Sequence, residues 1–141
     1  MRKTFLRSRR KGLKANLRRL CDTAWSELIR KRDPMCRWCE KRVSNQAHHI
    51  FGRRASNTRW DPENGLGICA GCHMHGHEWP LDFNEHIRTN VLGTEAYDSL
   101  RLRAGLVMKM NSDYQMVLVA LQLEAHRLGI TLNSIGGKKL L

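Results

Sequence analysis

The sequence predicts an α+β fold in which a small strand–loop–strand–helix core is flanked by helices on both sides. Apolar residues recur at helical spacing over residues 13–31 and again over residues 112–129. Short apolar runs separated by turn-rich segments lie between these regions, as is typical of strands. Two Cys-x-x-C pairs bracket the runs, so the middle of the chain is expected to close on itself.

The N-terminal region divides into an arm and a helix. Residues 1–12 are basic and show no clear periodicity, whereas residues 13–31 are expected to form a helix that ends at Asp33-Pro34. The apolar positions that predict this helix are Leu13, Leu17, Leu20, Trp25, Leu28 and Ile29.

The middle of the chain predicts a strand pair followed by a helix. Residues 34–42 form a first cysteine knuckle, and a strand is expected within residues 43–50. A loop with FGRR and DPENG as turn signals leads to a return strand over residues 65–69. A short helix then runs from the second knuckle to about Glu78 and stops at Pro80.

The remainder of the chain is predicted to be helical. Residues 81–91 form one helix, Thr94 begins the next, and Ser112 or Asp113 caps the last, which ends before Gly129. The expected division is a basic arm and helix (1–33), a core (34–80), a helical C-terminal segment (81–129) and a tail (130–141).

Positive charge is concentrated in the first half of the chain. The net charge is +12, and residues 1–60 contain 18 Lys and Arg against 4 Asp and Glu, whereas residues 61–141 contain 7 against 9. Such a field attracts polyphosphates, and release of counterions drives the binding. Nucleic acid is therefore the expected partner, and a solvated basic tail is the alternative.

No stretch approaches the roughly 20 apolar residues that a membrane span needs. The N-terminal stretch MRKTFLRSRRKGLK is basic but lacks the apolar middle of a secretory signal. We therefore expect a cytoplasmic protein without a membrane partner. A mitochondrial-type presequence is the alternative, because this stretch is rich in arginine and poor in acidic residues.

Four of the five cysteines form two pairs, Cys36 with Cys39 and Cys69 with Cys72, separated by 29 residues. Two such knuckles suit one tetrahedral structural Zn²⁺ site, which supplies folding free energy directly. Disulfides, a redox pair or buried apolar cysteines are the alternatives, and disulfides fit an intracellular protein poorly. Cys21 falls within a helix pattern and is expected to be a small buried side chain.

Five of the seven histidines lie between residues 47 and 78. His48 and His49 are adjacent on the first predicted strand and should point to opposite faces. His73 and His77 lie one helical turn apart, where two imidazoles can share a divalent cation. One strand histidine is therefore free for acid–base chemistry, and a metal ion with one such base suffices for phosphodiester cleavage.

The segment HHIFGRR…DPENGLGICAGCH resembles the core of the HNH endonuclease superfamily, the ββα-metal fold, in its version with a four-cysteine zinc site. The motif residues His49, Asn64 and His73 are separated by 14 and 8 residues. Cys72 directly precedes His73, as in many members of the family. The resemblance covers about residues 34–80, roughly a third of the chain.

The resemblance implies a catalytic role for each motif residue. His49 resembles the general base that activates water, and Asn64 resembles the residue that braces the loop and orients this base. His48 and His73 resemble the metal ligands, and His77 matches the additional ligand of members that end in His-x-x-x-His. The implied catalytic cation is Mg²⁺ or Mn²⁺, while three histidines would favour Zn²⁺, Ni²⁺ or Mn²⁺.

The predicted helix departs from the family pattern after His73. Many members place Lys or Asn shortly after the last motif residue, whereas this chain reads HMHGHEWP. Gly76 weakens a helix by up to about 1 kcal/mol relative to Ala, which leaves the orientation of His77 open. His75 falls off the face that His73 and His77 share.

Basic side chains before and inside the core are expected to hold the DNA backbone without sequence preference. Arginines of the loop between the strands could bind phosphates, with ordinary solvated loop charge as the alternative. The expected DNA contacts are Arg9, Arg10, Lys11, Arg18, Arg19, Arg53, Arg54 and Arg59.

The sequence thus favours a metal-dependent endonuclease acting on double-stranded DNA, and a non-catalytic zinc-ribbon module that binds nucleic acid is the alternative. The basic helix before the knuckles and LGTEAYDSL after them also resemble, more loosely, phage recombination nucleases of the NinG or Rap type. That likeness implies branched DNA as substrate and the host cytoplasm as location. The last helix is expected to be core, with a dimer face as alternative, so monomer and homodimer both remain.

Overall fold

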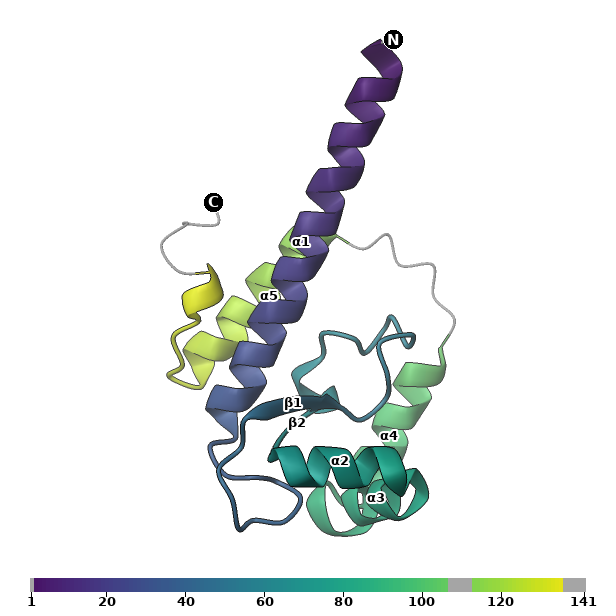
Figure 1. Ribbon diagram of the computed structural model, residues 1–141, viewed down its shortest axis with the longest axis vertical. Helices are drawn as coiled ribbons and strands as arrows, with labels where there is room; N and C mark the ends of the chain where they lie inside the picture. The colour runs from purple at the N-terminus through teal and green to yellow at the C-terminus, as the bar shows by residue number, and fades with distance from the viewer. Residues whose placement is uncertain (1, 107–112, 136–141) are drawn as a thin grey trace.

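The computed structural model describes residues 2–106 and 113–135 (Figure 1), and within them it is an α+β protein with five α-helices and one two-stranded antiparallel sheet. In chain order the elements are α1 (Arg2–Arg32), β1 (Gln46–His49), the 3-10 turn η1 (Pro62–Asn64), β2 (Gly65–Ile68), α2 (Ala70–Glu78), α3 (Pro80–His86), the π-helical stretch η2 (Ile87–Val91), α4 (Thr94–Gly105), α5 (Tyr114–Arg127) and the 3-10 turn η3 (Asn133–Ile135). The predicted fold class is confirmed at this level.

Residues 2–12 do not form a separate arm, because α1 is a single helix of 31 residues that begins at Arg2. Arginine, lysine and leucine are good helix formers, and no proline interrupts them. The first half of α1 projects from the body of the molecule, and the second half lies against α5 and the sheet (Figure 1). The helix ends at Arg32, where Asp33-Pro34 was expected to stop it.

The sheet is the short hairpin that the strand pattern predicts, with β1 limited to residues 46–49 of the expected 43–50. Gln46 pairs with Ile68 and His49 pairs with Gly65, so the two strands are in register over their whole length. Gly67 is required at its position, since a Cβ there would lie 2.6 Å from both the Cβ of Asp33 and the Oγ of Ser44. The backbone of β2 therefore packs closely against the two residues that precede and follow the first knuckle.

Two hydrophobic cores lie on opposite sides of the hairpin. The helical core joins α1, α5 and the end of the described chain, and its buried residues are Cys21, Ala24, Trp25, Leu28, Ile29, Leu118, Leu121, Ala125, Leu132 and Ile135. The cysteine-side core joins the sheet, the knuckles, α3 and α4, and its buried residues are Cys36, Ile50, Leu66, Ile68, Cys69, Cys72, Phe83, Ile87, Tyr97 and Leu100.

Residues 130–135 were expected to belong to a tail, yet they pack against α1. Leu132 and Ile135 are buried in the helical core. The carboxylate of Glu27 accepts hydrogen bonds from the backbone N–H groups of Asn133 and Ser134, at 2.7 and 2.9 Å, and from the Ser134 hydroxyl. The rest of the expected tail, residues 136–141, lies outside the described residues.

The C-terminal helices begin close to their predicted caps. Asp113 caps α5 and accepts hydrogen bonds from the backbone N–H groups of Gln115 and Met116. Thr94 begins α4 after Gly93, whose φ of 86° suits glycine. No helix of the described residues has the length and apolarity needed to cross a membrane.

Candidate functional site

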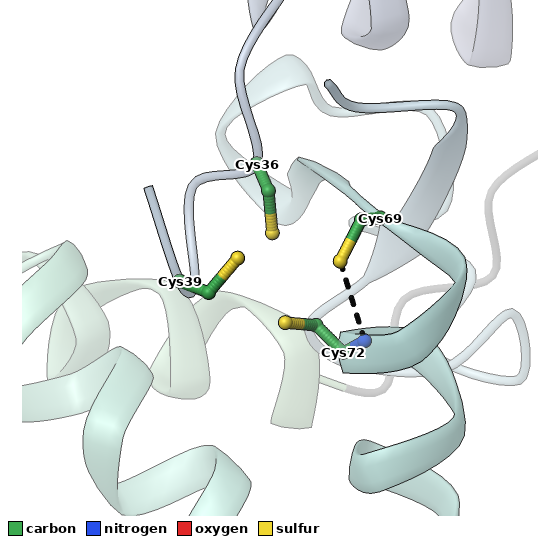
Figure 2. A group of neighbouring side chains, drawn as sticks. All are labelled: Cys36, Cys39, Cys69 and Cys72. Atoms are coloured by element: carbon green, nitrogen blue, oxygen red, sulfur yellow. Dashed lines mark hydrogen bonds between the residues drawn. The ribbon is translucent and has the colours of Figure 1, made fainter. Parts of the chain in front are cut away.

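The four knuckle cysteines converge on one point (Figure 2). Their sulfur atoms all lie within 4.8 Å of one another, and Cys36, Cys69 and Cys72 are buried. A tetrahedral zinc ion with zinc–sulfur bonds of about 2.3 Å holds its sulfurs roughly 3.8 Å apart, so the set fits such an ion. All five cysteines are free thiols, and the four could bind zinc as predicted, whereas Cys21 is buried elsewhere, in the helical core.

Each knuckle is shaped by backbone hydrogen bonds. In the first knuckle the Cys36 N–H donates to the Arg42 carbonyl, and the Glu40 N–H donates to the Cys36 carbonyl, both at 2.8 Å. Glu40 has a φ of 56°, a left-handed conformation that lets the turn close. In the second knuckle the Cys69 sulfur caps α2 by accepting from the Cys72 N–H at 3.5 Å, and this hydrogen bond would also stabilise the negative charge of a zinc-bound thiolate.

The hairpin places its two histidines on opposite faces. The His48 ring faces the cysteine-side core, where its centre lies 5.6 Å from that of His73 on α2 and 5.1 Å from that of Phe83 on α3. The His49 ring faces α1 and stacks on Trp25, with ring centres 3.8 Å apart and planes 13° from parallel. The alternation of side chains along β1 thus separates two groups that are adjacent in the sequence.

The three predicted metal ligands are neighbours, with His73 in the middle. Its ring centre lies 4.8 Å from that of His77, one turn further along α2, and 5.6 Å from that of His48. Within the described residues, only the four cysteines bring three or more ligand atoms all within 4.8 Å of one another. The histidines are therefore adjacent but do not form a preformed three-nitrogen cage. His75 instead contacts the Trp38 ring at 5.1 Å.

Burial favours the neutral form of the His48 and His73 imidazoles. It lowers the pKa of His48 to about 4, with further lowering from the nearby His73, His49 and His77. Burial and the proximity of His77 also lower the pKa of His73. A metal binds only the neutral form of imidazole, so a low pKa leaves both rings ready for ligation at neutral pH.

α2 remains helical through Gly76, and glycine is there for a packing reason. A Cβ on Gly76 would lie 3.1 Å from three carbons of the Phe83 ring. Phe83 is buried, lies parallel to Trp38 and meets His48 edge-on. The glycine therefore lets α3 pack closely against α2, and His73 and His77 keep their one-turn spacing.

One nitrogen of His49 is held by the backbone. Its Nε2 lies 2.9 Å from the carbonyl oxygen of Arg59. Because a carbonyl can only accept, Nε2 carries the proton in the neutral ring and Nδ1 keeps a free lone pair. Burial lowers the pKa of His49 and outweighs the opposing effect of the hydrogen bond to Arg59.

Asn64 braces the loop that carries this carbonyl. Its side chain is fully buried, accepts from the Phe51 N–H at 2.8 Å, and donates to the carbonyls of Phe51 and Thr58, each at 2.9 Å. The three bonds tie both ends of residues 51–58 to one amide. Thr58 precedes Arg59, so the amide fixes the chain next to the partner of His49.

Arg59 was predicted to contact phosphate, whereas in the structure its side chain is buried in an ion pair. Its guanidinium donates to both carboxylate oxygens of Asp22, at 3.0 and 2.7 Å, and Trp60 donates to the same carboxylate at 2.9 Å. The Arg59 side chain is only 10% exposed. It therefore anchors the loop to α1.

The other predicted DNA contacts lie on the surface. Arg18, Arg53 and Arg54 line a cavity of about 520 Å³ together with Trp60 and Tyr114. Arg9, Arg10, Lys11 and Arg19 are exposed along the first half of α1. The structure brings Arg18 of the helix to the two loop arginines, although they are 35 residues or more apart in the sequence.

Three residues that the sequence analysis did not assign to the site support its histidines. Asp22 holds Arg59 and Trp60, Trp25 stacks on His49, and Phe83 contacts His48. Asp22 is three residues before Trp25, which places both on one face of α1. The signal available for it was that Asp22 is one of only two acidic residues in this basic helix.

Comparisons of this chain with protein-family models, curated proteins and solved structures find no match. What the site can do is therefore inferred from its own residues.

Proposed function

We propose that this protein is a metal-dependent endonuclease of the HNH type that hydrolyses phosphodiester bonds of DNA. The observation that carries the proposal is the division between the two adjacent histidines of β1. His48 lies with His73 and His77, whereas His49 lies apart with one nitrogen held by a carbonyl. A ββα arrangement over a four-cysteine cluster, with these roles separated, is what the HNH resemblance implies.

In this proposal His49 is the general base. The Arg59 carbonyl fixes Nε2 as the protonated nitrogen, so Nδ1 accepts the proton of the attacking water. Stacking on Trp25 holds the ring plane, and Asn64 holds the loop behind it. The lowered pKa of His49 keeps the ring unprotonated, and hence able to act as a base, at neutral pH.

The residues that would hold a catalytic cation are His48, His73 and His77. Two imidazoles bound to one ion at metal–nitrogen distances of about 2.0–2.1 Å have ring centres roughly 5 Å apart, which is close to the observed 5.6 and 4.8 Å. Such an ion supplies Lewis-acid stabilisation of the charge on the phosphate. We propose Mg²⁺ or Mn²⁺, and the imidazole ligands also suit Ni²⁺ and Zn²⁺.

Charge supports DNA as the substrate. Exposed basic residues line α1, and four arginines, of which Arg59 is paired with Asp22, line the cavity beside the loop of His49. The proposed contacts are the predicted ones without Arg59. Lys and Arg bind phosphates without reading sequence, so we propose double-stranded DNA with little sequence preference.

The test is nicking of supercoiled plasmid by the purified chain with Mg²⁺, Mn²⁺, Ni²⁺ or Zn²⁺. We expect His49→Ala to lower the cleavage rate by about 10²–10⁴-fold, the usual contribution of a general base. His126→Ala, the same change at an exposed position on α5, serves as the matched control and should cleave like the wild type. DNA binding by fluorescence anisotropy should be the same for all three proteins.

The alternative is a zinc-ribbon module that binds nucleic acid without cleaving it. Binding by the wild type and by His49→Ala, with no nicking by either under any of the four metals, would establish that alternative. Adding flap and four-way-junction DNA to the assay tests the looser resemblance to recombination nucleases. Preferential cleavage of these over plasmid would make branched DNA the substrate.

A further inference from the structure

The projecting half of α1 has a basic face that leads directly to His49. With 3.6 residues per turn, residues spaced by four, three and four positions fall on one side of a helix. This side continues past the arginine cavity to the residues that hold the loop and the base. In order along the face they are Arg7, Lys11, Lys14, Arg18, Asp22 and Trp25.

The opposite side of the same helix has a different composition. Leu17 and Leu20 pack against the helical core, and Leu13 and Leu6 extend the apolar stripe beyond it. Arg9 and Arg19 also lie about 100° or more around the axis from the basic face. The positive charge is therefore distributed unevenly around the helix. One row of basic side chains lies on the side that leads to His49.

Where the basic face meets the loop, the charge is concentrated and unneutralised. Among the described residues, no carboxylate pairs with Arg18, Arg53 or Arg54, which share the 520 Å³ cavity. The carboxylate of Asp22 pairs with Arg59, the fourth arginine of the cavity, and accepts a hydrogen bond from Trp60. Four guanidinium groups thus line one cavity, and three of them have no ion-pair partner among the described residues, which matches the chemistry of a phosphate group.

We propose that the backbone of one DNA strand runs from the phosphate at His49 through this arginine cavity and along the basic face of α1 towards the N-terminus. The inference rests on the proposed function and adds to it the side on which the DNA lies. From Trp25 to Arg7 the helix rises about 27 Å, at 1.5 Å per residue. Neighbouring phosphates of one strand lie roughly 7 Å apart, about twice their 3.4 Å spacing along the duplex axis, so this length spans about four phosphates on one side of the cleaved bond.

The first experiment compares two triple variants that remove the same number of positive charges. Lys11→Gln/Lys14→Gln/Arg18→Gln removes three of the four cations of the basic face, and Arg30→Gln/Lys41→Gln/Arg101→Gln removes three exposed cations that are not among the proposed DNA contacts. Binding to a 30-base-pair duplex is measured by anisotropy over a range of salt, without added divalent metal. Each lost phosphate contact lowers the slope of log K against log salt by about 0.9, so we expect a loss of roughly 2.7 for the first variant and below 1 for the second.

The second experiment maps cut positions on short blunt duplexes labelled at either end. If DNA is held on one side only, cuts by the wild type should be excluded from roughly the last four nucleotides at one strand end, 5′ or 3′, but not at the other. The basic-face variant should lose this asymmetry, and the other triple variant should keep it. Helical content by circular dichroism confirms that both variants are folded.

The outcomes separate this inference from the proposed function. Equal losses of salt slope in the two variants, or cut positions distributed symmetrically about both ends, overturn the placement of DNA along α1. If only the basic-face variant loses salt slope and the wild type does not cleave DNA, the nuclease proposal is overturned. The placement of DNA along the basic face of α1 is then supported. Loss of slope together with one-sided cutting supports both.

Discussion

The two histidines of β1 are adjacent in the sequence but depend on different cores. His49 stacks on Trp25 of the helical core, which is built from ordinary apolar side chains of α1 and α5. His48 lies against Phe83 of the cysteine-side core, which includes three of the four knuckle cysteines. The proposed base is thus held by apolar packing, whereas the proposed metal ligands lie beside a core whose four knuckle cysteines could bind zinc.

The difference shows that one short hairpin can be stabilised by hydrophobic burial on one face and by a metal-binding cluster on the other. On the helical side, α1 and α5 bury leucines and a tryptophan over many turns, so this side can form by hydrophobic burial. On the cysteine side the elements are short, and their buried apolar side chains are joined by three of the four knuckle cysteines. A zinc ion bound by the four cysteines would add to this burial, because ion binding contributes directly to the folding free energy.

The largest effect that this comparison predicts is that of losing the ion. Cys72→Ala should remove bound zinc and unfold the cysteine-side core, since structural zinc contributes on the order of 10 kcal/mol. Cys21→Ala is the matched control: it removes a buried thiol from the helical core and should cost only about 1–2 kcal/mol. Zinc content and thermal unfolding followed by circular dichroism measure both.

Removal of zinc from the wild type by a chelator should reproduce the Cys72→Ala result. The helical core should retain part of its helical signal, because none of its buried side chains belongs to the knuckles. If the zinc-free protein melted at the same temperature as the zinc-loaded one, the distinction between the two cores would be wrong.

Much of the fold follows from local signals in the sequence. The cysteine spacing predicted the cluster, the strand pattern predicted the hairpin, and Asp113 was one of two expected caps for α5. The placement of His48 and His49 on opposite faces follows from the two-residue period of a strand. These features depend on residues close in the chain or on a motif with fixed chemistry.

The features that could not be predicted are set by contacts between distant segments. Arg59 looked like a free loop cation, and only the fold brings it to Asp22, 37 residues away. Residues 130–135 looked like a tail because their anchor, Glu27, is more than 100 residues distant. Gly76 looked like a helix defect, and only the packing of α3 places the Phe83 ring against it. Local patterns contain no information on such pairings.

The next largest effect concerns how the stability of the helical core depends on pH in acid. Burial alone would raise the pKa of Glu27, but hydrogen bonds from Lys31, Ser134 and Asn133 outweigh burial and lower it to about 2. A lowered pKa stabilises the fold fully above the usual value of 4.5 and progressively less as the pH falls towards 2. Glu27→Gln should therefore cost about 3 kcal/mol at pH 7 and weaken the pH dependence between 4.5 and 2.

The matched control for Glu27 is Glu85→Gln on α3. Glu85 is 62% exposed and pairs with Arg88 at 3.6 Å, a geometry that contributes little to stability. Urea unfolding at several pH values measures both variants. An acid profile of Glu27→Gln identical to that of the wild type would show that this carboxylate does not fasten the end of the described chain to α1.

The smallest expected effects are the stability changes caused by replacing two glycines with alanine, one glycine in each region. The two changes should have opposite signs. A Cβ on Gly12, in the projecting half of α1, would have no neighbouring atom within 4 Å, whereas a Cβ on Gly76 would lie 3.1 Å from the Phe83 ring. Alanine is better than glycine in a helix by roughly 0.5–1 kcal/mol, so Gly12→Ala should raise helical content and not lower the melting temperature.

Gly76→Ala gains the same helical propensity but should lower stability by up to about 1 kcal/mol, because the new methyl group presses on Phe83. That ring is buried and stacked on Trp38, so it cannot move freely. Circular dichroism at 222 nm and the melting temperature measure both variants. A Gly76→Ala protein more stable than the wild type would show that the cysteine-side core is loosely packed around His48.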